Sequence, residues 1–229
     1  GLRGLAQALC VALPILGLAV NGSACSERGQ FQVPDSLAVV TFQVPSGALV
    51  VTGSDLTAGM FLYGSLVLKT DWEVVPVGLV ASEWFLARLP AERAEALRHG
   101  GLGALLVRER GRGVPVFLDF LPAGMAGFFV PEGLLYRYLA PGEPIPRRSE
   151  ASRRSLDILD RVARRGDYTW EAGRPFCTRH LVQTWAWSYQ TAGEGLLQED
   201  PTRAAEALEE ARRMLRGDPA RRAGLEGPS

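Results

Sequence analysis

Short apolar runs alternate with helically spaced apolar positions through the middle of the chain. Four runs have the length and composition of buried strands; they cover residues 48–52, 73–80, 102–107 and 114–120. The intervening segments carry helix-start residues or apolar positions at helical spacing, which predicts helices over 34–44, 56–68, 82–89 and 90–99. Two closing strands are expected at 128–130 and 134–139. This alternation predicts an α/β fold with a Rossmann-like, mostly parallel sheet and flanking helices.

The last third of the chain is predicted to be helical. A Pro-rich linker over 141–149 is followed by amphipathic patterns at 150–165, 179–197 and 201–215. Ala204, Leu208 and Ala211 have the small-large-small spacing of the second helix of a tetratricopeptide hairpin, with 185–192 as the facing helix. Residues 150–217 are therefore expected to form a tetratricopeptide-like helical tail, and 218–229 a disordered polar end.

The N-terminal segment is almost wholly apolar. Between Leu2 and Val20 only Arg3 and Gln7 are clearly polar, and as a helix the segment would be about 28 Å long, close to the hydrocarbon thickness of a bilayer. We interpret residues 1–21 as a transmembrane helix, the last of a larger set that precedes Gly1. A signal peptide or lipoprotein leader and a buried soluble helix are the alternatives.

Charge and cysteine content argue against nucleic-acid binding, a disulfide framework and a zinc site. Acidic and basic residues balance at 25 each, so no net field favours nucleic acid as a partner. Cys10, Cys25 and Cys177 lie too far apart for a disulfide framework or a zinc site. No metal site is predicted.

One candidate ligand site follows the first strand. Gly53, Ser54 and Asp55 lie where that strand ends and the next helix begins. Ligands of open α/β sheets bind at this edge, and a helix N-terminus favours anions. Helix capping by Ser54 or Asp55 explains the same residues without a ligand.

A second candidate is an aromatic concentration in the helical tail. Trp185, Trp187 and Tyr189 lie within five positions, and Trp170 is nearby. Packing between helices is one interpretation, and a partner-binding surface is the other.

The chain offers no recognisable catalytic set. His99 and His180 are the only histidines, and a G-x-S-x-G elbow is absent. His180 lies near Cys177 and could pair with it. No catalytic residue is predicted.

The order of the segments resembles a known family. An apolar helix is followed by PSGALVVTGSD (45–55), WEVVPV (72–77), SEWF (82–85), RGVPVF (112–117), EGLLYRY (132–138) and the helical tail. This order resembles the C-terminal part of a bacterial multi-pass membrane family related to protein O-mannosyltransferases, which are GT-C type enzymes. The resemblance implies an extracytoplasmic α/β domain over 22–140 and a catalytic membrane region upstream of Gly1.

Three functions follow as hypotheses. The first is a non-catalytic extracytoplasmic region of a membrane glycosyltransferase, located at the cell membrane, with the lipid bilayer and a protein or glycan acceptor as partners. The resemblance implies a polyprenyl-phosphate sugar donor for the full-length enzyme and no cofactor in this chain. The second is an exported or lipid-anchored binding module. The third is a soluble nucleotide-dependent enzyme, for which the sequence offers no phosphate cradle.

Overall fold

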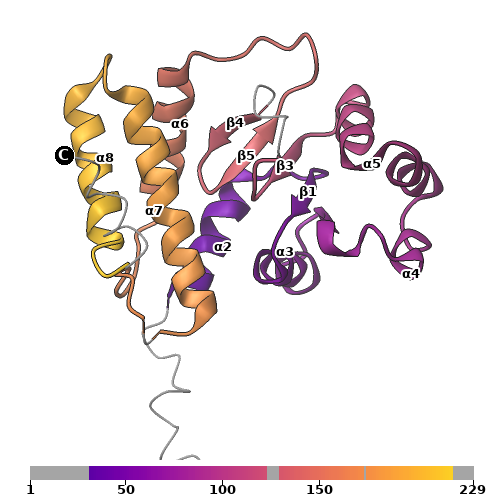
Figure 1. The fold of residues 1–229 in the computed structure, drawn as a ribbon, viewed down its shortest axis with the longest axis horizontal. Helices are drawn as coiled ribbons and strands as arrows, with labels where there is room; N and C mark the ends of the chain where they lie inside the picture. Colours follow the sequence, from indigo (N-terminus) through magenta and orange to yellow (C-terminus); the bar gives the residue numbers. More distant parts are fainter. Residues whose placement is uncertain (1–30, 123–128, 173, 219–229) are drawn as a thin grey trace, which may run out of the picture. The chain divides into compact units, whose positions relative to one another are not determined.

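The computed structural model describes residues 31–122, 129–172 and 174–218, which belong to one compact unit. In chain order the first elements are α2 (Gln32–Gln43), β1 (Leu49–Thr52), α3 (Asp55–Val67), β2 (Glu73–Pro76), a 3-10 turn η1 (Val77–Leu79), α4 (Glu83–Leu86) and α5 (Ala91–Gly111). The remaining elements are β3 (Val116–Leu118), β4 (Phe129–Glu132), β5 (Leu135–Tyr138), α6 (Arg148–Asp160), α7 (Phe176–Leu196) and α8 (Pro201–Met214) (Figure 1).

The sheet is mixed, and the prediction of a mostly parallel sheet is corrected. Its strand order is β2-β1-β3-β5-β4, in which β1 is parallel to β2 and β3. The β3–β5 and β4–β5 pairs are antiparallel. The two closing strands form a tight hairpin, which requires no crossover helix. Gly133 in its turn has a φ of 59°, a left-handed conformation suited to glycine.

The predicted strand at 102–107 is wrong. These residues continue α5, which bends at Gly101, where φ is 64° and ψ is −160°. Leu105 and Leu106 are fully buried on the inner face of this helix. A six-residue apolar run suits a buried helix as well as a buried strand, and only packing against the sheet distinguishes the two.

Side chains of the strands alternate between two apolar layers. Val50 of β1 and Phe117 of β3 belong to the cluster that contains residues of α2, α3 and α6–α8. Their neighbours Val51 and Leu118 face the opposite cluster, with residues of α4 and α5. Figure 1 shows α6, α7 and α8 gathered on one side of the sheet and α4 and α5 on the other. This alternation follows from the two-residue period of a strand.

The C-terminal helices pack onto the α/β part. Trp185 and Ala204, from α7 and α8, belong to the same cluster as Val40 of α2 and Val50 of β1. The indole N–H of Trp185 donates to the Ser36 hydroxyl at 2.8 Å. The helices α7 and α8 therefore extend the core of the sheet domain.

The predicted transmembrane architecture is also corrected. Among the described residues, no helix combines the length and apolar character needed to cross a bilayer. The two longest, α5 and α7, each have 21 residues, but both carry charged side chains. Residues 1–21, to which the membrane helix was assigned, lie outside the described residues, as do 219–229 of the predicted disordered end. The predicted bilayer contact and cell-membrane location therefore gain no support from the structure.

Candidate functional site

A cleft of about 580 Å³ opens at the carboxyl edge of the sheet. We call it the Asp119 cleft. It is lined by residues that follow β1 and β3, by the start of η1, by one residue of β5 and by two of α7, namely Gly53, Ser54, Val77, Asp119, Phe120, Leu121, Tyr136, His180 and Trp187. Five segments that are separated in the sequence thus meet at one opening.

The sheet topology creates this opening. The chain leaves β1 through α3 to reach β2 on one side, and later enters β3 on the other side of β1. The α3 residues Met60 and Phe61 lie in one apolar layer, whereas α5 contributes Leu105 to the opposite layer. The strands that follow β1 and β3 in the chain, β2 and β4, lie on opposite sides of the β1–β3 pair. Ligands of open α/β sheets bind at such a switch point.

Asp119 directly follows β3 and contacts the loop after β1. The Gly53 backbone N–H donates to Asp119 Oδ1 at 2.6 Å. Burial raises the pKa of the Asp119 carboxyl, while hydrogen bonds from Gly53, Thr57 and Ser54 act in the opposite direction without cancelling the effect. A half-buried carboxyl with a raised pKa in a cleft is typical of a functional position.

Gly53 allows the two loops to approach closely. A Cβ at this position would lie 2.9 Å from Phe120 Cδ1 and 3.5 Å from Asp119 Oδ1. Any larger residue would displace the Phe120 ring or separate the loops. Gly53 therefore shapes the cleft through its small size.

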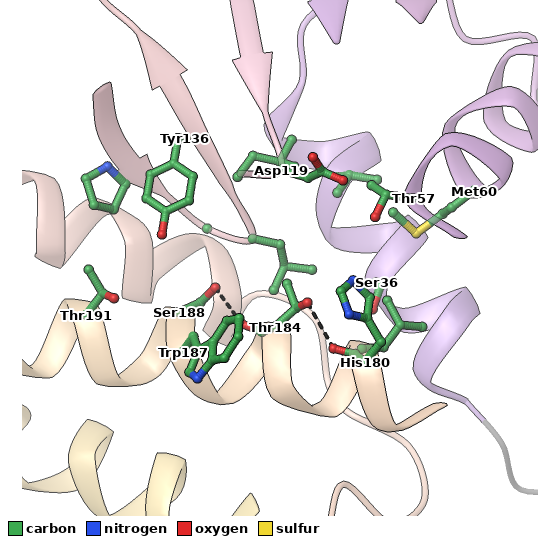
Figure 2. A pocket seen from close by; sticks show the side chains of 16 residues that line it. Ser36, Thr57, Met60, Asp119, Tyr136, His180, Thr184, Trp187, Ser188 and Thr191 are labelled. Atoms are coloured by element: carbon green, nitrogen blue, oxygen red, sulfur yellow. Dashed lines mark hydrogen bonds between the residues drawn. The ribbon is translucent and has the colours of Figure 1, made fainter. Parts of the chain in front are cut away.

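An inner extension of about 90 Å³ continues from the cleft between α3 and α7. The two spaces share Asp119, Tyr136, His180 and Trp187. Figure 2 shows Asp119 on the same side of this extension as Thr57 and Met60 of α3. His180 and Trp187 lie along α7. The hydroxyl groups of Thr184 and Ser188 donate to backbone carbonyls one turn earlier in α7, at 3.0 and 2.9 Å. Asp119 is the one acidic residue among the described residues that line this extension.

The structure separates the predicted ligand residues. Gly53 and Ser54 line the cleft, whereas Asp55 is exposed and is not part of the lining. Ser54 is also the N-cap of α3, because its hydroxyl accepts the Thr57 N–H at 3.1 Å. Capping and cleft lining thus coincide at Ser54.

The predicted aromatic surface is also divided. Trp185 is fully buried and Tyr189 nearly so, and their rings stack at 6.4 Å. Trp187 is 54% exposed and lines the cleft. Helical geometry turns successive positions by about 100°, so Trp187 lies on a different face from its neighbours. Only this residue of the three is available to a ligand.

Comparison with known proteins adds no relative. No family model, no curated protein and no solved structure matches the chain. The resemblance to protein O-mannosyltransferases, with its polyprenyl-phosphate sugar and acceptor, therefore stays a prediction.

Sequence reasoning missed Asp119 and Tyr136 and considered His180 only beside Cys177. In the structure the His180 ring stacks on Phe176 at 6.0 Å and lines the cleft, while Cys177 is a free thiol outside the lining. The detectable clue was Asp119 itself, a single acidic residue within the apolar run 114–121. No group of three potential metal ligands occurs among the described residues.

We expect Asp119→Asn to preserve or raise stability at neutral pH. A raised pKa means that the folded state binds the proton more tightly. Protonated Asp119 therefore stabilises the fold at pH values below its pKa in the unfolded chain, about 3.9. This stabilisation is lost as the pH rises through its pKa in the folded protein. The amide oxygen of asparagine can still accept the Gly53 N–H.

Urea unfolding between pH 3 and pH 7 measures this effect. The free energy of unfolding of Asp119→Asn should fall less with rising pH than that of the wild type. Asp55→Asn, an exposed substitution that removes one carboxylate outside the cleft, serves as the matched control. If Asp119→Asn showed the same pH profile as the wild type, the raised pKa of Asp119 would be contradicted.

Proposed function

We propose that the described part of this chain is a ligand-binding module that holds a small organic molecule in the Asp119 cleft. The observation that carries the proposal is the convergence of Asp119 and the exposed Trp187 on one opening at the switch point of the sheet. Small-molecule sites combine mostly apolar walls with a few convergent polar groups. The proposal retains the binding-module hypothesis and makes no use of a membrane anchor.

The size and lining of the cleft support this function. Its volume of about 580 Å³ lies within the roughly 300–1,000 Å³ typical of small-molecule sites. Phe120, Leu121 and Tyr136 provide apolar walls, and Asp119 and Ser54 provide polar groups. A large exposed aromatic ring at the opening gives a ligand a surface on which to stack.

A fragment screen with the full chain tests the proposal. Ligand-observed NMR would compare the wild type with Trp187→Ala and with Trp84→Ala. Trp84 is the matched control, since it is also 54% exposed but belongs to α4 and lies outside the cleft. We expect a group of fragments that bind the wild type and Trp84→Ala and lose binding to Trp187→Ala. Fragments that bind all three proteins equally, or no binding at all, would refute the proposal.

A further inference from the structure

The charge of the cleft is one-sided. Among the described residues that line the cleft and its inner extension, Asp119 is the only acidic one, and none is arginine or lysine. His180 is the one histidine among these described residues. Within the described part of the chain, none of the ion pairs between basic and acidic side chains includes Asp119. The carboxylate is thus left without a strong cationic partner.

The aromatic rings of the cleft are similarly free of cations. Elsewhere in the described residues, arginine guanidinium groups lie over the rings of Phe31, Phe42, Trp84, Tyr168, Trp170, Trp185 and Tyr189. None of those contacts involves Phe120, Tyr136 or Trp187, the aromatic residues of the cleft. An aromatic face attracts a cation through its quadrupole, most strongly when water is excluded.

An anion is disfavoured at the same place. The loop N–H of Gly53 already donates to Asp119, and the Ser54 hydroxyl already accepts from Thr57. The carboxylate of Asp119 therefore lies where an anion would approach the start of α3. The anion predicted for Gly53, Ser54 and Asp55 would meet like charge and few free donors.

We propose that the ligand of the Asp119 cleft is a small organic cation, an ammonium group with apolar substituents. Its charge lies against Asp119, and its apolar surface lies against Trp187, Tyr136 and Phe120. This inference rests on the proposed function and specifies the chemistry of the same site.

Matched probes separate charge from shape. Choline and 3,3-dimethylbutan-1-ol have nearly the same size and shape, but only choline is charged. Titration calorimetry with the full chain should give choline an affinity about tenfold higher or more, since a cation–π contact and the attraction of the carboxylate both favour the charged probe. Inorganic phosphate, the third probe, should not bind.

Three variants locate the effect. Asp119→Asn should reduce the affinity for choline toward that of the neutral alcohol and leave only the preference that the cation–π contact provides. Asp55→Asn should retain the wild-type preference. Trp187→Ala should weaken the binding of both organic probes. A circular dichroism spectrum and unfolding curve for each variant would show that the fold is retained.

The outcomes distinguish this inference from the proposed function. Equal affinity for choline and the alcohol, no binding of choline, or binding of phosphate at this site would overturn the cation assignment. If fragments still bind in a Trp187-dependent way, the binding module stands and its ligand belongs to another class. If no fragment depends on Trp187, both proposals fail.

Discussion

Trp185→Ala is expected to lower the free energy of unfolding by about 3–5 kcal/mol, the usual cost of removing a large buried aromatic side chain. Trp185 is 0% exposed. Its ring contacts Tyr168 edge-on at 5.4 Å and stacks on Tyr189. The indole also donates to Ser36 of α2, so its loss leaves both a cavity and an unpaired hydroxyl between α2 and α7. Chemical denaturation monitored by far-UV circular dichroism measures the change.

Trp187→Ala is the matched control, because the same substitution occurs two positions along the same helix. Trp187 is more than half exposed, so its removal should change stability by no more than about 0.5 kcal/mol. The pair separates the packing and binding interpretations of the aromatic concentration. Equal destabilisation by both substitutions would show that Trp187 is part of the core and would remove the basis for the binding site.

Glu109→Ala is expected to lower the free energy of unfolding by about 3 kcal/mol or more. Glu109 is fully buried on α5 and accepts a hydrogen bond from Arg93 at 2.7 Å. The Arg93 side chain is only 10% exposed. Removing one member of a buried pair leaves the other charge desolvated, which usually costs about 3–5 kcal/mol. The half-exposed Glu73, which also contacts Arg93, would compensate for part of this loss.

Glu83→Ala is the control for this pair. The Arg98–Glu83 ion pair has the same N–O distance of 2.7 Å, but both side chains are exposed. Solvent screens such pairs, so little change in stability is expected. If the two alanine variants were equally stable, burial of the Arg93 pair would not be the source of its strength.

The Glu109 effect should also depend on pH. Burial by itself would raise the pKa of Glu109, but Arg93, together with Arg112 and Arg108, outweighs it and lowers the pKa. The stabilisation is therefore present above the unfolded pKa of about 4.3 and is lost as the pH falls through the folded pKa. The difference between wild type and Glu109→Ala should shrink in acid, as denaturation series at pH 7 and below pH 4 would show.

Local pattern predicted much of the fold. The apolar run 48–52 became β1, because a short buried strand between turn residues leaves few alternatives. The start of α8 followed from local chemistry, since Pro201 occupies the first turn and the Asp200 carboxylate accepts the Arg203 N–H. The run 102–107 failed, because its length fitted both a strand and a helix.

The candidate site was less accessible to sequence reasoning. Asp119 directly follows β3 and Tyr136 lies on the neighbouring strand β5. His180 and Trp187 lie more than forty positions further along the chain. Nothing in local spacing indicates that these four side chains share one opening. The sequence indicated only the loop after β1, because the position of a strand end can be read locally.

By itself, the sequence determined the alternation of strands and helices and the apolar identity of the core, since both depend on residue type and short spacing. Tertiary structure decided which aromatic residue of α7 is buried and which lines the cleft. It also placed Asp119 against Gly53, 66 positions apart in the chain. The physical reason is that strand order and helix packing bring distant residues together, and the burial that raises the pKa of Asp119 exists only after they have done so.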